Sequence, residues 1–221
     1  MKIWITLFLC WTSWTAAAAE TVVPLWQQMQ KAALVSPDVA EVRRILDAGF
    51  DPNGSIGCGD WPALMAAVQH RNVEMAAVLL ERGAKVPDEA MLRACQTYDQ
   101  ELTLVTLLRS HGGNGNAGND ATSCLHAAAW YGNVPLVKWL AASPGIDLNR
   151  VRQDGDLDGT PLMWALRRGN TRVAQVLIAA GASPAIKGRT GATAVSIVAE
   201  QLKVYAELQA SLKAPAGSSN R

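Results

Sequence analysis

Three carboxylates spaced two residues apart form the pattern in this sequence that most directly suggests chemistry, and they are Asp154, Asp156 and Asp158. Alternating carboxylates at this spacing are the ligands that a calcium-binding loop offers. Such a loop also places a glutamate at its twelfth position, and counted from Asp154 that position is Ala165. Asp-Gly steps also form turns in solvated loops. We therefore interpret the run as a solvated turn, with calcium binding as the alternative.

Histidine and cysteine are the other side chains that could bind a metal or act as nucleophiles. They are widely separated and lack the close pairing of a zinc site; those after the N-terminal segment are His70, His111, His126, Cys58, Cys95 and Cys124. Three cysteines leave at least one that is free or pairs between chains in an oxidising compartment. At positions 95 and 124 cysteine serves as a small apolar residue, and Cys58 is the more accessible one. No pairing follows from these positions.

Motifs for catalysis are also missing. We find no nucleophile elbow, no glycine loop that cradles phosphate before a helix, and no catalytic dyad. The sequence therefore predicts a protein that is not an enzyme and that uses no cofactor and no metal. The alternative is an enzyme whose site lies in the acidic segment around residues 154–158.

The charge balance bears on the kind of partner, and the N-terminal segment bears on location. The chain has 20 Lys+Arg and 19 Asp+Glu, a formal net charge of +1, so no basic excess suggests nucleic acid as a partner. Residues 1–19 resemble a secretory signal peptide, with Lys2, an apolar run from residue 3 to 14, and Ala17–Ala19 before the cleavage point. The run is shorter than the roughly 20 residues of a membrane span. We expect cleavage after Ala19, a mature chain without membrane insertion, and a periplasmic location, with another secretory route as the alternative.

The elements that position these residues form an internal repeat. The segment from Ser123 to Asn149 contains Leu125-His126-Ala127-Ala128, and similar segments occur at 160–165, 62–67 and, more weakly, 193–196. A second column of residues supports the repeat, because glycines recur 34, 29, 33 and 36 residues apart, at Gly49, Gly83, Gly112, Gly145 and Gly181. Glycine after a helix can adopt the left-handed conformation that ends it.

This pattern resembles the ankyrin-repeat family, in which a turn and two antiparallel helices recur about every 33 residues. Leu125, His126 and Ala128 match the core of the family signature T-P-L-H-x-A, and residues 160–165 match it more closely, with Met163 in the histidine column. The resemblance covers residues 25–212. It implies an all-α ankyrin-repeat solenoid of about five to six helix-turn-helix repeats with short β-turn fingers, in which His126 makes hydrogen bonds within and between repeats.

The repeat columns predict the domain organisation. A signal peptide spans 1–19, the ankyrin-repeat domain 20–212 and a disordered tail 213–221. Inside the domain the expected parts are an N-terminal cap at 20–53, repeats at about 54–87, 88–116, 119–149 and 150–186, and a C-terminal cap at 187–212. We expect the cap at 20–53 to begin with a helix over 25–34 that buries Trp26 and Met29, and a last pair of helices over 188–212.

The spacing between columns also predicts the connections between repeats. Only 8 residues lie between Gly83 and Leu92, whereas 16 lie between Gly145 and Leu162. The finger between repeats two and three should therefore be nearly absent, and the finger that carries residues 154–158 should be long. The glycine-rich segment 112–118 is expected to be a solvated connection.

The resemblance also indicates a surface for partners, because fingers and first helices line the concave face of such a solenoid. The positions least constrained by packing there are rich in Trp, Tyr and Arg, the residues that most often carry interface energy. We predict partner binding by Trp61, His70, Tyr98, Trp130, Tyr131, Trp164, Arg167 and Arg168. For Trp61 and for Trp164 the alternative is that the ring leans against a neighbouring repeat and is half-buried. The strongest part of this prediction is the cluster from Trp130 to Arg168 in repeats four and five.

The expected function follows from the resemblance and the signal peptide. Ankyrin-repeat proteins are overwhelmingly binding modules, so we expect a non-enzymatic protein that docks another protein on its concave face. Some exported members neutralise an enzyme or toxin that acts in the cell envelope, which makes an inhibitor or immunity role the more specific expectation. The alternative is a periplasmic scaffold or stress-related factor that inhibits nothing.

Overall fold

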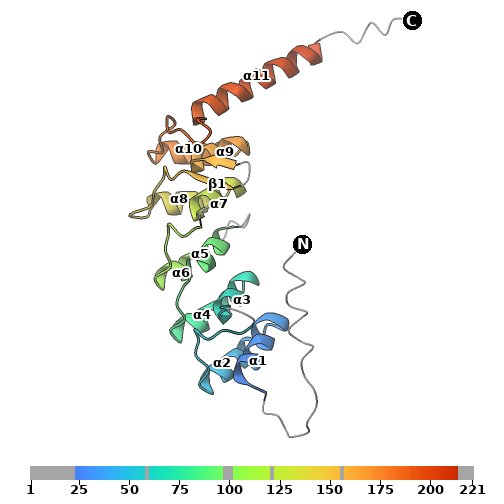
Figure 1. Cartoon of the computed structure of the whole chain (residues 1–221), viewed down its shortest axis with the longest axis vertical. Coiled ribbons are helices and arrows are strands. Elements are labelled where there is room, and N and C mark those ends of the chain that lie inside the picture. Colours follow the sequence, from blue (N-terminus) through green and yellow to red (C-terminus); the bar gives the residue numbers. More distant parts are fainter. Residues whose placement is uncertain (1–22, 58–59, 97–101, 120–121, 155–156, 214–221) are drawn as a thin grey trace, which may run out of the picture. The chain divides into compact units, whose positions relative to one another are not determined.

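The computed structural model describes residues 23–57, 60–96, 102–119, 122–154 and 157–213 (Figure 1). The predicted signal peptide and the tail beyond residue 213 lie outside these residues. The chain forms two compact units, Met1–Ala94 with Thr103–Asn114, and Cys95–Leu102 with Gly115–Arg221. Among the described helices, none combines the length and the apolar character needed to cross a membrane.

The first unit consists of short helices joined by turns (Figure 1). In chain order they are α1 (Leu25–Gln30), the π-helical turn η2 (Lys31–Val35), α2 (Val39–Asp47), α3 (Ala63–Gln69), α4 (Val73–Glu81), α5 (Asp88–Cys95, whose last residue belongs to the second unit) and α6 (Thr103–Ser110). Side-chain caps start two of them. Asp38 accepts hydrogen bonds from two amides of α2, and Asn72 accepts one from Met75 in α4.

The second unit repeats this plan and adds a β-hairpin. Its elements are α7 (Cys124–Tyr131), α8 (Val134–Ala142), β1 (Arg152–Asp154), β2 (Leu157–Gly159), α9 (Pro161–Arg167), α10 (Thr171–Ala179) and α11 (Ala194–Lys213). β1 and β2 are antiparallel, with Arg152 opposite Gly159. Thr160 caps α9, and Pro161 is its first residue, where the missing amide hydrogen would have no helical partner.

The repeat boundaries have the backbone conformation that the glycine column predicts. All five column glycines adopt positive φ, from 78° at Gly145 to 98° at Gly181, a region that L side chains rarely occupy. Each therefore ends a second helix and turns the chain into the next finger. Short first and second helices then pack as antiparallel pairs, α3 with α4, α7 with α8, and α9 with α10.

Asparagine side chains hold successive loops together. In the first unit, Asn53 donates to the carbonyl of Gly83 at 3.2 Å and accepts from the amide of Lys85 at 2.8 Å. In the second unit, Asn116 makes the same pair of bonds to Gly145 (2.6 Å) and Asp147 (3.0 Å). We call this two-sided contact the asparagine clasp.

Asn149 makes the accepting half of the clasp in the following repeat, because its side-chain oxygen accepts from the amide of Ser183 at 2.8 Å. A clasp satisfies backbone groups that a loop leaves without partners, so each of these three loops is fixed by the repeat before it.

Several expectations about individual elements need correction. The helix expected over 25–34 is α-helical only to Gln30 and continues as a π-helical turn; Met29 is fully buried, but Trp26 is 46% exposed. The last pair of helices over 188–212 is a single 20-residue helix, α11, because residues 194–213 contain neither glycine nor proline to break it. The segment 112–118 is only partly solvated, since Gly112 and Asn114 are exposed whereas Gly113, Gly115 and Ala117 are buried.

The two finger lengths are confirmed. Only a loop of six residues separates Glu81, which ends α4, from Asp88, which begins α5, and this loop has no strand. The long finger forms the β1–β2 hairpin. In the shorter fingers, isolated antiparallel β-bridges pair Ser55 with Pro62 and Gly118 with Ser123.

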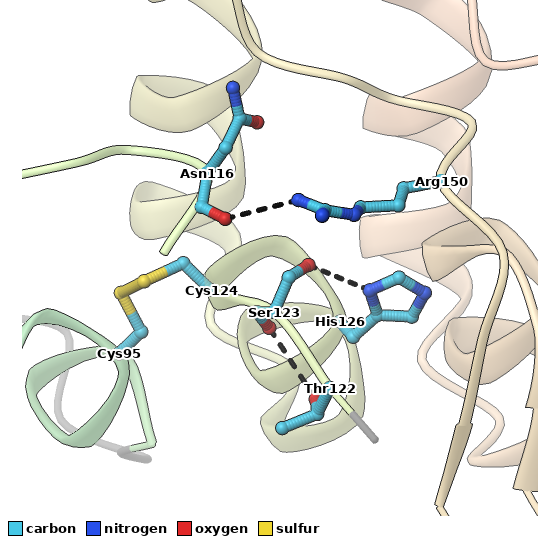
Figure 2. The surroundings of a disulfide bond; sticks show 7 residues. All are labelled: Cys95, Asn116, Thr122, Ser123, Cys124, His126 and Arg150. Atoms are coloured by element: carbon cyan, nitrogen blue, oxygen red, sulfur yellow. Dashed lines mark hydrogen bonds between the residues drawn. A yellow bond between two sulfur atoms is a disulfide. The ribbon is translucent and has the colours of Figure 1, made fainter. Parts of the chain in front are cut away.

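The structure contains a disulfide between Cys95 and Cys124, a pairing that the sequence left open (Figure 2). The bond lies in the second unit and joins the last residue of α5 to the first residue of α7, with Cα atoms 5.2 Å apart. Both cysteines are fully buried, so they do fill small apolar positions, but they also cross-link segments 29 residues apart. Such a cross-link stabilises the fold mainly by reducing the conformational freedom of the unfolded chain.

Removal of this disulfide should lower the stability of the second unit. The variant Cys95→Ala/Cys124→Ala is expected to lose about 3 kcal/mol of unfolding free energy, the size expected for a closed loop of this length. Urea denaturation of oxidised protein measures the change. A reducing agent should shift the unmodified chain by a similar amount and leave the double variant, which keeps Cys58, unshifted. Equal midpoints for oxidised and reduced unmodified protein would contradict the assignment.

Candidate functional site

The candidate site lies where the first helices of repeats four and five end. Its four residues are Trp130 and Tyr131, at the end of α7, and Arg167 and Arg168, at the end of α9; we call this group the Trp130 site. α7 and α9 pack against each other, which brings the two helix ends together. The repeat therefore positions residues that are about 37 apart in sequence side by side.

Arg168 and Trp130 form the exposed part of the site. The guanidinium carbon of Arg168 lies 4.5 Å from the centroid of the Trp130 ring, within the range of a cation–π interaction. Arg168 is exposed and Trp130 is partly buried. An interaction of this kind contributes roughly 0.5–1 kcal/mol at an exposed position. The pair therefore presents a flat aromatic and planar cationic surface in a fixed orientation.

Trp164 packs against the buried side of this surface. Its ring meets Trp130 edge-to-face at 6.1 Å between centroids and meets His126 edge-to-face at 4.8 Å. Trp164 is only 3% exposed. Of the two alternatives for Trp164, the structure shows the one in which the ring packs against its neighbours, and the ring is buried beyond the half expected. Trp164 orients Trp130 and offers almost no surface of its own to a partner.

Arg167 points to the β-hairpin instead of the solvent. Its Nη1 atom donates to the backbone carbonyl of Asp158 at 2.5 Å. The Asp158 carboxylate, which is 1% exposed, accepts from the amides of Arg189 (2.8 Å) and Thr190 (2.7 Å) and from the Thr190 hydroxyl (2.9 Å). Burial alone would raise the pKa of Asp158, but these hydrogen bonds outweigh it and hold the pKa below its usual value.

Asp158 is thus a structural residue that ties the hairpin to the loop before α11. Its two oxygens are already engaged by three donors, which leaves little capacity for a calcium ion or for catalysis. The side chain of Asp154 and residue Asp156 lie outside the described part of the chain. Of the three carboxylates that suggested calcium binding, Asp158 is therefore already occupied by hydrogen bonds within the protein.

The other predicted residues are not gathered around Trp130. Trp61 and His70 belong to the first unit, where Trp61 is partly buried with the guanidinium of Arg93 5.5 Å from its ring, and His70 is exposed at the end of α3. Tyr98 lies outside the described residues. The structure therefore shows one joined cluster, in repeats four and five, and two separate positions in the first unit.

Asn170 is a supporting residue that the sequence reasoning missed. Its amide nitrogen donates to the carbonyls of Ala129 (2.8 Å) and Trp130 (3.0 Å), the backbone groups at the end of α7. These bonds hold the backbone that carries Trp130. A signal was present, because Asn133 and Asn170 each follow a glycine that ends a first helix, Gly132 and Gly169.

His126 links repeats four and five, as the resemblance implied. One ring nitrogen, Nε2, lies 3.1 Å from the carbonyl of Gly159, and the other, Nδ1, lies 2.7 Å from the Ser123 hydroxyl (Figure 2). Because a carbonyl only accepts, we assign the proton to Nε2, and Nδ1 then accepts from Ser123. The ring is fully buried, and this burial lowers the pKa of His126 from 6.5 to about 4.

Comparison with known proteins agrees with this geometry. A family model for ankyrin repeats (many copies) matches residues 29–80 and 124–178. The Ankyrin repeat, SAM and basic leucine zipper domain-containing protein 1 of Dasypus novemcinctus is 31% identical over 152 residues, which are 69% of this chain and 26% of that protein. The Homo sapiens protein of the same name is 28% identical over 161 residues, or 72% of this chain and 28% of that protein. The chain spans about a quarter of the length of these curated relatives.

Solved structures show the same fold. An ankyrin repeat domain from Acinetobacter baumannii AYE is similar with a TM-score of 0.68 and 25% identity, over 78% of this chain and 90% of that chain. The crystal structure of a second ankyrin repeat protein is similar with a TM-score of 0.67 and 22% identity, over 80% and 92%.

The stacked helix pairs define a helical repeat protein. The chain belongs to the ankyrin-repeat family. Ankyrin repeats are protein–protein interaction modules, and the fold is typically a non-catalytic scaffold.

The buried His126 should make stability depend on pH. Its pKa is lower in the folded chain than in the unfolded chain, so below about 6.5 the unfolded chain gains a proton that the folded chain does not take up until about pH 4. The neutral His126 ring therefore contributes its full share of the unfolding free energy above pH 6.5. This contribution, about 3 kcal/mol, is lost as the pH falls from 6.5 to 4. Urea denaturation at pH 7 and pH 4.5 measures most of this loss, about 2.4 kcal/mol between those two pH values.

The variant His126→Gln isolates the contribution of the ring. It should be less stable at pH 7, because the bonds to Ser123 and Gly159 are weakened, but its stability should fall less between pH 7 and pH 4.5. His111→Gln is the matched control, since His111 is exposed. An equally steep pH dependence in all three proteins would show that His126 does not carry it.

Proposed function

We propose that this protein binds a partner protein through the Trp130 site. The observation that carries the proposal is the stacked pair of Arg168 and Trp130 on a buried tryptophan. Tryptophan, tyrosine and arginine are the residues most enriched at the energetic centres of protein interfaces. A rigid support also favours binding, because side chains that are already ordered lose less conformational entropy when a partner docks.

We further propose that the protein acts in the periplasm and that the partner is an envelope or secreted enzyme or toxin that it inhibits. The signal-peptide pattern of residues 1–19 supports export. The buried disulfide between Cys95 and Cys124 supports it independently, because such bonds form and persist in oxidising compartments. The inhibitory role rests on the similarity in plan to exported ankyrin-repeat proteins that neutralise envelope enzymes.

A binding role also fits the acidic finger better than catalysis does. The Asp158 carboxylate is buried and engaged by backbone amides, so its function is to connect the β-hairpin to residues 189 and 190. The hairpin in turn holds Arg167. The finger thus supports the end of α9, where the Trp130 site begins.

A capture experiment tests the proposed site. Protein from residue 20 to 221 is immobilised and exposed to envelope extract, next to the variants Trp130→Ala/Arg168→Ala and Arg172→Ala. The double variant should bind the captured partner at least about 30-fold more weakly, the effect of losing about 2 kcal/mol at an interface centre. Arg172→Ala is the matched control, since Arg172 is an exposed arginine of the same repeat, on α10, and should bind normally.

The possible outcomes distinguish failure of the proposed Trp130 site from failure of the proposed inhibitory role. Equal binding by all three proteins would contradict the Trp130 site and direct attention to Trp61 and Arg93 in the first unit. The identified partner is then purified and its activity measured with increasing amounts of the protein. A partner without enzymatic or toxic activity, or one whose activity is unchanged at saturation, would contradict inhibition and leave a scaffold.

A further inference from the structure

Two asparagines of this chain are followed directly by glycine, Asn53 and Asn114. Asparagine is a thermolabile residue, and a following glycine makes loss of its amide easiest, because glycine has no Cβ to hinder the closure of a ring. The backbone nitrogen of the glycine attacks the side-chain carbon of the asparagine, and a cyclic imide forms as ammonia leaves. Water then opens the imide at one of its two carbonyls and gives aspartate or isoaspartate.

The asparagine clasp engages both reacting groups at Asn53. Its Nδ2 atom donates to the carbonyl of Gly83 at 3.2 Å, and its Oδ1 atom accepts from the amide of Lys85 at 2.8 Å. The attacking nitrogen, in Gly54, donates its own hydrogen to the carbonyl of Asp51 at 2.8 Å. Ring closure would have to break these bonds, so Asn53 can react only from a state in which the clasp has opened.

Asn114 lies outside the clasp, because in its repeat the clasp residue is Asn116. Among the described residues, the amide of Gly115 donates to no acceptor, so the attacking nitrogen is not held as that of Gly54 is. The Asn114 side chain is exposed, and its Nδ2 atom donates to Oδ2 of Asp88 in a long bond of 3.3 Å. Gly115 is buried, but it attacks its own neighbour, from which ammonia can leave into solvent.

The loop around position 114 can also hold the aspartate product. In two other repeats the residue in this column, two places after the column glycine, is Asp51 or Asp147. The carboxylate of each accepts from the amide two residues on, at 2.9 Å and 3.0 Å. Aspartate is therefore a residue that this loop already carries elsewhere in the chain. Isoaspartate is not, because it adds one carbon to the backbone.

We propose that Asn114 is a site of spontaneous deamidation in the folded protein, whereas Asn53 is protected by its clasp. The co-reactant is water, and the products are ammonia and a chain with one more negative charge. The bond from Nδ2 to Asp88 is lost with the amide. Asn114 ends a segment of the first unit and Gly115 begins a segment of the second. Isoaspartate thus lengthens the backbone where the chain passes from one unit to the other.

The folded structure, and not the sequence around the two asparagines, is what separates them. Both are followed by glycine, so an unfolded chain should lose the two amides at similar rates. In the folded chain the rate at Asn53 is reduced by the small fraction of molecules in which the clasp is open. The ratio of the two rates therefore measures how firmly the clasp is closed.

Incubation of residues 20–221 at pH 8, followed by mass mapping of the peptides that contain each site, tests the proposal. In buffer, Asn114 should be deamidated at least about ten-fold faster than Asn53, because only Asn53 must wait for a local opening. In guanidinium chloride that unfolds the chain, the two rates should become similar. Asn114→Gln is the matched control. It keeps an amide but requires a larger ring, so the mass change at position 114 should disappear while the rate at Asn53 is unchanged.

Two results would overturn the proposal, with circular dichroism confirming that the chain and the Asn114→Gln variant are folded in buffer. One is an equal rate at the two sites in the folded chain, since the clasp would then protect nothing. The other is a folded chain that keeps the Asn114 amide over a period in which the unfolded chain loses it. Neither measurement uses a partner, so failure here and failure of the Trp130 site remain distinguishable.

Discussion

The structure depends on the fact that no helix pair in this chain can be stable alone. Apart from α11, the described α-helices have six to nine residues, well below the roughly 12–15 residues at which an isolated helix becomes marginally stable in water. Each pair is therefore ordered by its neighbours, through packed alanines and leucines and through polar contacts between repeats. His126 and the asparagine clasps belong to these contacts, because each joins backbone groups of one repeat to a side chain of another. The site inherits its rigidity from the same contacts.

The Trp130 site shows how such stacking produces the proposed binding surface. The rings from His126 through Trp164 to Trp130 form a series that runs from the fully buried interior to the partly exposed surface, and Arg168 lies on its outer end. The buried members belong to the interface between α7 and α9 that the fold requires in any case. The proposed binding surface therefore needs only the outermost residues in addition to an arrangement that packing already imposes.

Much of this arrangement could be predicted from the sequence, because ankyrin columns repeat at a nearly fixed period. The positive φ at the column glycines, the long hairpin and the role of His126 all follow from single columns. The sequence left the burial of Trp164 as one of two alternatives, since it depends on which rings the preceding repeat places beside it. The disulfide was also missed, because Cys95 lies in a repeat with few signature residues, and its distance from Cys124 depends on packing between two helices.

The asparagine clasps have a consequence for the length of the protein. Each clasp joins residues about 29 to 34 positions apart, close to one repeat period, and reaches no farther than the next loop. Whole repeats with a suitable asparagine could therefore be inserted or removed without altering the contacts of the repeats that remain, as in other proteins that are stabilised by nearest neighbours. The Cys95–Cys124 bond is the exception, because a covalent link across a repeat boundary fixes which two repeats must be adjacent. Repeats could thus be gained or lost during evolution on either side of the Cys95–Cys124 bond, but not between the two repeats that it joins.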